Sequence, residues 1–528
     1  MDNKEVTAVE IWHKYEQGVD WHHKNSLYTK TDKCHRFYEG DQWRDRHGSI
    51  GDDLPTYNFI KPTVDYKTAM IAQNSMVINY SPTGADETEM QACTLLNAFA
   101  AKKWDNLKMD TQLWDCVKEA AITGDSFLYF YDDALGSQLL QTDKVFLGDE
   151  QQQDIQKQPY IIVFERRLVR DVKEEAKDYG LPEDEIALIQ PDDDENNLDE
   201  SINEVKGKQS EKCSTLLYIT RENGMVQFCR STQHVVFQKM QTIEGMTHYP
   251  IAKLTWQKKH ESSRGVGEVW WLIPNQVEVN KNLYRRLESV KATAFPKPVY
   301  VEGMIQNPEG IATVGTPVKV REGSVQKVNE LFTFLQPAAI SGDAKLLQDE
   351  LLENTRELAN AGDNAMGNIN PERASGSAIV AVKDAQAVPL NEQKAAAKQF
   401  VEDIALIWLD ILTAYGTNGI PTEEGIITAE MLEGLEPEIR IDVSDGNPFS
   451  KYAREQALEN ALAAGHITFE EYVNSLDEDA HAPKAKFQEI LKARQGMAEE
   501  VPDEVLEGQM PMPEIPPEMI NSQMMPMV

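Results

Sequence analysis

The chain has 528 residues, of which 41% are hydrophobic and 26% charged, and its formal net charge is −35. This composition is typical of folded proteins, and the length provides for two to four domain-sized units or for one elongated protein with several regions. So large a negative charge repels other polyanions, which makes the chain a poor candidate for tight, non-specific DNA binding through its overall field.

Cysteine usage and hydropathy bear on the compartment. The five cysteines have no paired short spacing: Cys34, Cys93, Cys116, Cys213 and Cys229. An odd, scattered set predicts reduced thiols in a cytoplasm-like compartment. The N-terminus carries no apolar signal region, and no apolar run is long enough to cross a membrane, so we expect no membrane partner.

Residues 1–261 predict an α+β body. Apolar residues keep helical spacing along much of the first 124 residues, and strand patterns occur at 76–80, 127–131, 160–164, 215–219 and 234–237. The segment 181–200 holds nine acidic residues and no basic one. It lacks the turn glycine of a calcium loop, so we expect a solvated, mobile loop over 181–212.

A helix is predicted next, within 262–294. The segment 262–267, Ser-Ser-Arg-Gly-Val-Gly, predicts a flexible joint, and Pro274 suits the first turn of the helix. Apolar residues follow with three-and-four spacing: Val279, Leu283, Leu287, Val290 and Ala294. Basic residues occupy the remaining surface: Lys281, Arg285, Arg286 and Lys291.

The chain then goes out and returns. Residues 295–337 are rich in valine, glycine and proline and predict a small β-containing excursion. Within 338–361, Ser341 can cap a second helix, and a polar loop over 362–374 follows it. The pattern over 375–416 is helical, with a kink or break expected at Pro389. The second half of this helix has a wide apolar face, formed by Val401, Ile404, Ala405, Trp408, Ile411, Leu412 and Tyr415.

The C-terminal part divides at residue 499. Residues 417–498 predict further helices, with a capping box at 468–471, Thr-Phe-Glu-Glu. Residues 499–528 are rich in proline, methionine and glutamate without a period, which predicts a disordered tail.

Motifs of catalysis and metal binding are weak or missing. The pairs His22-His23 and Cys34-His35 match no common zinc spacing. The sequence contains no Walker A motif, no His-Glu-x-x-His and no Gly-x-Ser-x-Gly. Gly265-Val-Gly267 lacks the third glycine of a nucleotide fingerprint, so we interpret it as a hinge. We therefore expect neither enzymatic activity nor a cofactor or metal.

The order helix, β excursion, helix, polar loop and long kinked helix resembles the tailed-bacteriophage portal (head-to-tail connector) protein. Short sequence words in the same order support the resemblance and run through most of the chain: Phe37-Tyr-Glu-Gly-Asp-Gln-Trp43, Asn58-Phe-Ile-Lys-Pro-Thr-Val64, Tyr249-Pro-Ile251, Gly265-Val-Gly-Glu-Val269, Pro274-Asn-Gln-Val-Glu-Val-Asn-Lys281 and Ser375-Gly-Ser-Ala378.

The resemblance implies a mainly helical α+β portal fold with named regions. These are the wing (1–261), the descending stem helix (262–294), the clip (295–337), the ascending stem helix (338–361), the tunnel loop (362–374), the long kinked wing helix (375–416) and a helical crown (417–498). In the family the tunnel loop is the narrowest part of a DNA channel. The corresponding residues here are Met366, Gly367, Asn368, Ile369, Asn370 and Arg373.

The resemblance also implies function and partners. A dodecameric ring would occupy one capsid vertex of the virion, after assembly in the host cytoplasm, as the channel for packaging and ejection of double-stranded DNA. The expected partners are the terminase large subunit, the major capsid and scaffolding proteins, and a head-tail adaptor protein.

Two questions stay open on the residues alone. Between Arg264 and Lys297 lie six basic and three acidic residues, an excess that fits either pairing with an acidic helix of a neighbouring subunit or passing contacts with DNA phosphates. Alternative functions are a metal-dependent nucleic-acid-processing enzyme, such as a terminase subunit, and a non-viral helical scaffold.

Overall fold

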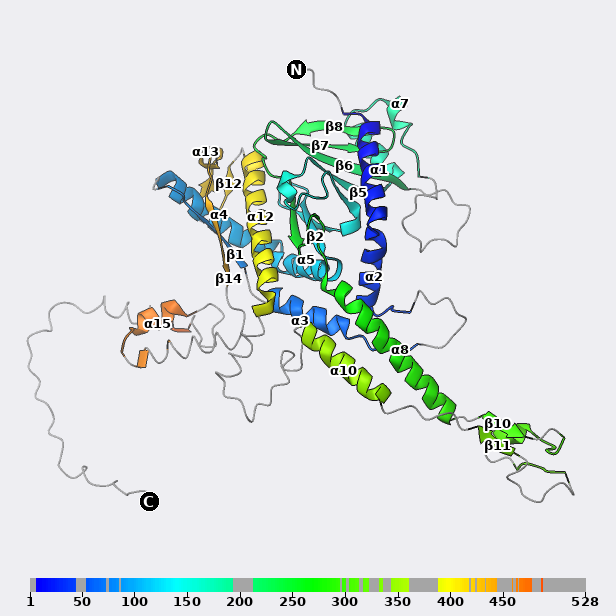
Figure 1. The fold of residues 1–528 in the computed structure, drawn as a ribbon. Helices are drawn as coiled ribbons and strands as arrows, with labels where there is room; N and C mark the ends of the chain where they lie inside the picture. The colour runs from blue at the N-terminus through cyan, green and yellow to red at the C-terminus, as the bar shows by residue number, and fades with distance from the viewer. Residues whose placement is uncertain are drawn as a thin grey trace, which may run out of the picture. The chain divides into compact units, whose positions relative to one another are not determined.

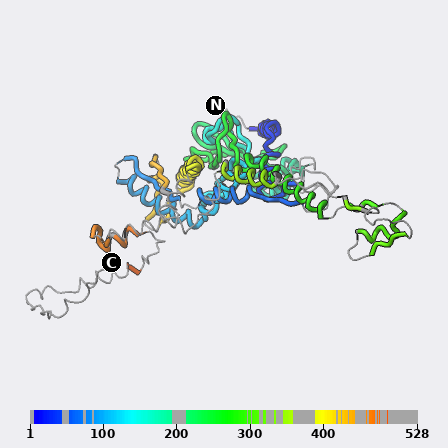
Figure 2. The backbone as a smooth tube through the Cα atoms, turned by 60° about the horizontal axis from the view of Figure 1, so that its bottom comes forward, coloured from blue at the N-terminus to red at the C-terminus, as the bar shows by residue number. Residues whose placement is uncertain are grey.

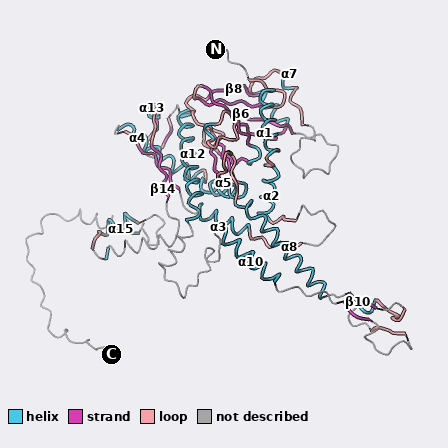
Figure 3. Tube along the Cα trace, viewed as in Figure 1, coloured by secondary structure: helices cyan, strands magenta, loops and turns pink. Residues whose placement is uncertain are grey.

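The computed structural model describes residues 6–43, 54–72, 76–84, 87–192, 212–294, 297–300, 303–312, 317–321, 332–335, 343–359, 388–416, 419–422, 425–432, 434–443, 458, 462–463, 465–476 and 486–487. The chain forms two compact units, Met1–Gly446 and Asn447–Val528, which are described separately. In the described residues both units contain helices, and the strands lie in the first unit (Figure 3).

An antiparallel five-stranded sheet forms one half of the body of the first unit (Figure 1). Its order is β4-β5-β6-β7-β8, with bounds Val145–Leu147, Tyr160–Leu168, Lys212–Glu222, Met225–Ser231 and Val236–Thr242. Asn223 and Gly224 connect β6 to β7, both with positive φ, as a tight hairpin turn requires.

Both faces of this sheet are covered. Helix α1 (Ala8–Lys24) lies on one face, where Tyr15 packs against Phe146 and Phe164 with ring centroids 4.9 and 5.6 Å apart. Thr7 and Glu10 form a capping box that fixes the start of α1. Successive side chains of a strand point to opposite faces, so Ile161 and Val163 of β5 point to the other face and join the main core of the unit.

A smaller sheet and four helices form the other half of the body. The sheet has the order β3-β2-β9, with bounds Ser137–Leu140, Asp125–Phe130 and Ile251–Thr255. The helices are α2 (Leu27–Glu39), α3 (Ile60–Ala72), α5 (Met109–Thr123) and α12 (Asn391–Tyr415).

The apolar face predicted for α12 is buried except at its end. Val401, Ile404 and Trp408 are at most 1% exposed, and the Trp408 ring lies 6.0 Å from that of Trp104. Tyr415, expected on the same face, is 49% exposed because it lies at the last turn of the helix.

The chain after α12 returns to the body as strands. β14 (Glu438–Val443) pairs with β1 (Met76–Ser81), and β12 (Ile420–Pro421) pairs with β13 (Ile426–Ile427). The short helix α13 (Ala429–Leu432) packs against α4 (Glu87–Asn106). The expectation of an entirely helical region over 417–498 is therefore wrong for 420–443, where residues 438–443 alternate between polar and apolar residues, as a strand does.

The acidic segment 181–212 is ordered at its start. Helix α6 (Val169–Asp178) precedes the short helix α7 (Glu183–Ile186), and Ile186 and Ile189 are buried against it. The expectation of a mobile loop is wrong for 181–192, because two isoleucines anchor that part. Residues 193–211 lie outside the described residues.

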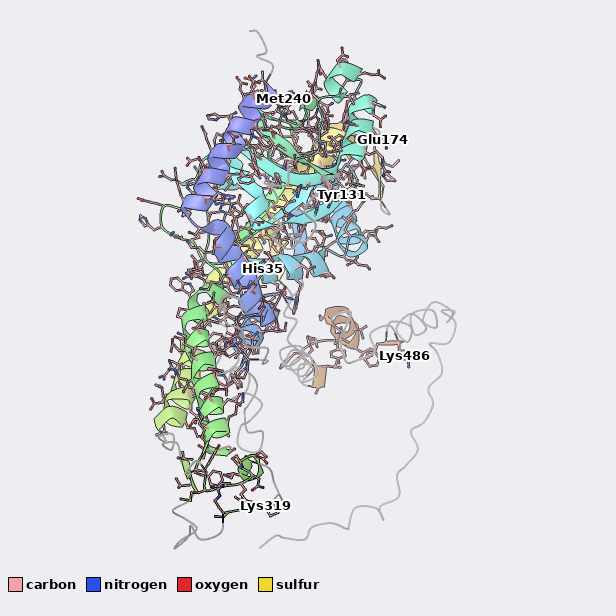
Figure 4. The ribbon with its side chains drawn as sticks, turned by 90° about the vertical axis from the view of Figure 1, so that its right-hand side faces the viewer. His35, Tyr131, Glu174, Met240, Lys319 and Lys486 are labelled. Atoms are coloured by element: carbon pink, nitrogen blue, oxygen red, sulfur yellow. The ribbon has the colours of Figure 1, made fainter. Side chains whose placement is uncertain are left out.

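Two helices leave the body side by side. They are α8 (Glu268–Ala294) and α10 (Asp343–Leu358), which we call the stem pair (Figures 1 and 2). Beyond α8 lie the two-stranded ribbon of β10 (Lys297–Tyr300) and β11 (Phe332–Leu335) and the short helix α9 (Glu309–Ala312). Lys319 belongs to this tip, far from the body residues His35 and Tyr131 (Figure 4).

The C-terminal unit has a small apolar cluster of its own. Its described helix is α15 (Phe469–Ser475), on which Tyr472 and Val473 are buried with Leu476. The cluster also contains Phe487.

The mixed helix-and-sheet architecture confirms the α+β class, and all five predicted strands are present. The strand predicted over 234–237 lies further along the chain than expected, since β8 begins at Val236 and ends at Thr242. Among the described helices, none has the length and apolar character to cross a bilayer.

Candidate functional site

Helix α8 is the element that bears most of the predicted site residues. The prediction that it begins at Pro274 is wrong, because the helix begins at Glu268 and Pro274 lies inside it. Proline in a helix interior costs about 3 kcal/mol. Burial of Val269, Leu272 and Ile273, each stabilising by about 1.5–3 kcal/mol, outweighs that cost and draws the preceding turn into the helix.

Two amide side chains of α8 fix the root of the stem pair to the body. Gln276 and Asn280 lie one turn apart and are 0% and 2% exposed. Gln276 accepts a hydrogen bond from the Phe59 N–H at 3.1 Å and donates to the Tyr57 carbonyl at 2.7 Å. Asn280 accepts from the Tyr57 N–H at 3.1 Å and donates to Gln42 Oε1 at 2.5 Å. These bonds satisfy backbone groups of an irregular segment and so set the position of α8.

Three sequence words that carry the resemblance meet at this root. The word 37–43 contributes Gln42, the word 58–64 contributes Phe59, and the word 274–281 contributes Gln276 and Asn280. Their shared structural role is to join α8 to the body, across more than two hundred positions of sequence.

A buried ion pair holds the segment just before α8. Arg264, 4% exposed, donates to Glu150 through Nε at 3.1 Å and Nη2 at 3.0 Å. It also donates to the carbonyls of Thr142 at 3.2 Å and Val145 at 2.6 Å. Burial alone lowers the pKa of Arg264, but the charge and hydrogen bonds of Glu150 raise it above its ordinary value. The guanidinium is therefore charged and its donors are used.

A second buried charge lies beside the first. Asp125 accepts hydrogen bonds from the Gly265 N–H at 2.7 Å and from Thr255 Oγ1 at 2.9 Å. Lys253 Nζ lies 3.6 Å from Asp125 Oδ1 and donates to the Ser263 carbonyl. Burial lowers the pKa of Lys253, and Asp125 opposes that shift.

The glycines of this segment serve close packing. A Cβ at Gly265 would lie 2.5 Å from the Gly124 carbonyl oxygen, and one at Gly267 would lie 2.4 Å from that of Ile122. Both positions therefore require glycine because backbones approach each other there. The prediction of a flexible joint at 262–267 is wrong, since side chains and backbone hold the segment to β2, β9 and α5.

The far half of the stem pair differs from the root. On α8, Leu287 is 39% and Val290 62% exposed, and on α10, Leu346 is 61% and Leu347 59% exposed. Two side-chain hydrogen bonds join the helices: Asn275 donates to Thr355 at 3.0 Å and Arg286 to Gln348 at 2.5 Å. The predicted apolar stripes are therefore divided: Val279 is buried, Leu283 and Leu351 are half-buried, and Leu287, Val290 and Leu347 are exposed.

The four basic residues predicted on α8 have different surroundings. Lys281 pairs with Glu278 at 2.6 Å and Lys291 with Glu288 at 3.3 Å, both within the helix. Arg286 is half-buried against α10, and Arg285 is exposed. Arg285 is therefore the best placed of the four to meet a group outside this chain.

The predicted loop residues lie outside the described part of the chain. These are Met366, Gly367, Asn368, Ile369, Asn370 and Arg373. Pro389 is described: it lies in a 3-10 turn, Val388–Leu390, directly before α12. Residues 375–387 are not described, so the expected kink within a longer helix stays a prediction.

The histidine and cysteine pairs do not form a metal site. Burial lowers the pKa of His22 to about 2, and its ring stacks on Phe146 at 4.5 Å, so this histidine is a neutral core residue. His35 instead pairs with Glu119 at 3.1 Å. Over the ranges that the structure describes, no group of three or more His, Cys, Asp or Glu residues could hold a metal ion.

No protein-family model matches the chain, and no curated protein sequence is significantly similar to it.

Proposed function

We propose that the chain is a portal protein, which forms a ring at one vertex of a phage capsid and provides the channel for double-stranded DNA. The order of its elements supports this proposal: an α+β body, a helix leading out to a β ribbon, a helix leading back, and a long amphipathic helix. The observation that carries it is the far half of the stem pair, which exposes Leu287 and Val290 on α8 and Leu346 and Leu347 on α10.

A neighbouring copy would cover these side chains. The stem helices also carry opposite charges on exposed positions: Arg285 on α8, and Asp349, Glu350 and Glu353 on α10. A head-to-tail contact between α8 of one copy and α10 of the next would cover the exposed apolar side chains of both helices. It would also place Arg285 opposite the acidic residues of α10. Repeated by a fixed rotation that closes, such a contact generates a ring.

The charge of the chain fits a channel through which DNA moves. A strongly basic lining would hold phosphates through counterion release and would resist movement. In a ring of chains that each carry −35, DNA would meet few cations along the channel and its phosphates would be touched only in passing. By the same resemblance, the partners would be the terminase large subunit, capsid and scaffolding proteins, and a head-tail adaptor.

The tunnel loop is part of this proposal. Residues 366–370 would line the constriction and contact DNA by shape, without reading bases. Replacing 366–370 by a short Gly-Ser linker in the phage should leave rings intact and reduce DNA packaging or retention. Wild-type packaging and retention with intact rings would contradict the assignment of the constriction.

The experiment that tests the function is imaging of the purified protein together with enzyme assays. Ring-shaped particles with a central channel are expected, without ATP hydrolysis or nuclease activity. Monomers with metal-dependent nuclease activity would instead support the nucleic-acid-processing enzyme.

A further inference from the structure

The loop before α8 presents an exposed tryptophan beside a basic run. Trp271, in the first turn of α8, is 60% exposed, and its Nε1 donates to Gln257 Oε1 at 3.1 Å. Lys258, Lys259 and His260 follow Gln257 and are all exposed. We call Trp271 and residues 258–260 the Trp271 surface.

This surface is held rigidly. The carbonyl of Gln257 accepts a hydrogen bond from the Val266 N–H at 3.0 Å, and that of Lys259 accepts one from Gln153 at 3.3 Å. The loop ends at Ser263 and the buried Arg264 described above. A pre-organised aromatic anchor loses little entropy on binding, and tryptophan is enriched among the residues that dominate protein interfaces.

A hollow of opposite character lies elsewhere on the same unit. It has a volume of about 470 Å³ and lies between the start of α4 and the segment from α13 to β14. Its lining includes three glutamates and two apolar side chains: Glu89, Glu430, Glu436, Met431 and Leu435. The nine lining residues include no basic one.

The walls of the hollow are also fixed. Glu89 accepts hydrogen bonds from the N–H groups of Thr83 at 2.9 Å and Gly84 at 3.0 Å. Thr83 donates to the carbonyl of Glu436 at 2.7 Å, which ties the two sides together. An apolar cavity of roughly 150 Å³ already admits benzene, so this hollow has room for an indole ring.

The two surfaces lie on different flanks of the body. Figure 1 places α4 and α13 on one flank and α1 and α2 on the other. Helix α2 packs beside the first turns of α8, where Lys30 Nζ lies 5.7 Å from the Trp270 ring. A ring needs two different, complementary surfaces on each copy, one facing each neighbour.

We propose that the Trp271 surface of one copy docks into the acidic hollow of the next copy, with Trp271 against Met431 and Leu435 and the lysines near Glu430 and Glu436. This inference rests on the proposed ring and names a second contact within it, on the body instead of the stem pair. Copies that each carry −35 repel one another, and the contact places cations opposite carboxylates where they meet.

A second copy fits this surface better than DNA does. Aromatic side chains bind nucleic acid mainly by stacking on unpaired bases, which a duplex does not offer. Two lysines and one histidine, next to Glu261, are also few for a chain with so large a negative field.

Cross-linking tests the contact directly. Cysteines introduced as K258C and E436C in one chain should give a ladder of covalently joined copies on oxidation, and neither single variant should. The five native cysteines are buried, so they interfere little. Wild-type rings that form without any ladder in the double variant would overturn the docking. Absence of rings from the unmodified protein at every concentration would overturn the proposed ring and the docking together.

Charge exchange provides the second measurement. Trp271→Ala and the pair K258E/K259E should each raise the concentration needed for ring assembly at least about tenfold. The pair E430K/E436K should do the same, and all four changes together should restore assembly in part. Trp114→Ala and Lys177→Glu are matched controls, since Trp114 is 38% exposed and Lys177 is exposed. Unchanged assembly combined with reduced DNA retention would assign the Trp271 surface to DNA and overturn the proposal.

Discussion

The root and the far half of the stem pair belong to the same two helices but are built differently. At the root, Gln276, Asn280 and Arg264 are buried, and their donors and acceptors are bonded to the body. In the far half, Leu287 is 39% and Leu347 59% exposed in the single chain. Contacts within one chain therefore set the position of the stem, whereas its exposed apolar surface is left for contact with a second chain.

Arg264→Ala should have the largest effect on the body. The change leaves the Glu150 carboxylate buried without its partner, which costs about 3–5 kcal/mol in the free energy of unfolding. Chemical denaturation of the purified protein measures this loss. Loss of less than about 1 kcal/mol would mean that the root does not depend on its ion pair.

Gln276→Ala tests the amide contacts of the root. The N–H of Phe59 and the carbonyl of Tyr57 lose a partner, so the free energy of unfolding should fall by about 1–3 kcal/mol. Glu278→Ala is the matched control on the same helix, because Glu278 is exposed and should change stability by about 0.5 kcal/mol or less. Equal effects of the two changes would contradict the root contacts.

Asp403→Asn tests an acid of the body that is not fully compensated. Burial, aided by the charges of Asp154 and Glu402, raises the pKa of Asp403 to about 6. The folded state therefore binds a proton more tightly than the unfolded chain, and the wild-type protein gains stability as the pH falls through 6. The variant should be more stable at pH 7.5 by about 1–2 kcal/mol, and this difference should vanish near pH 4. Thermal unfolding of both proteins across this pH range measures the difference. A difference that does not change with pH would contradict the raised pKa of Asp403.

Leu346→Ser with Leu347→Ser should have the smallest effect on a single chain. Both side chains are mostly exposed, so the free energy of unfolding of the monomer should change by about 0.5 kcal/mol or less. Ring assembly, measured by mass photometry, should fall sharply because the stem contact loses its apolar surface. Val9→Ser is the matched control, since Val9 is 72% exposed on α1. Normal assembly of the double variant would remove the far stem from the interface.

The sequence predicted what local patterns encode. Three-and-four spacing located α10 and α12, and short runs rich in apolar residues located β1, β2, β5 and β6. The flexible joint predicted at 262–267 and the start of α8 predicted at Pro274 were wrong for a physical reason. The glycines at 265 and 267 meet Gly124 and Ile122, about 140 positions away, and no local pattern distinguishes such close packing from flexibility.

The buried polar groups of the root were missed for a related reason. Gln276 and Asn280 lie at helical spacing with Val269, Ile273 and Val279, on the buried face, but amides are usually assigned to the solvent side. A buried-face glutamine and asparagine, one turn apart, are a signal that could have been read. Their partners, Tyr57 and Phe59, could not, because only the folded chain brings them together.

The central claim is that single chains are incomplete and close into a ring through the stem pair. Electron microscopy of purified full-length protein, with mass photometry on the same sample, tests it most directly. The account predicts closed rings of about a dozen copies with a central channel, formed by a repeated head-to-tail contact. Monomers alone at micromolar concentration, with no rings after addition of scaffolding or capsid protein, would contradict it.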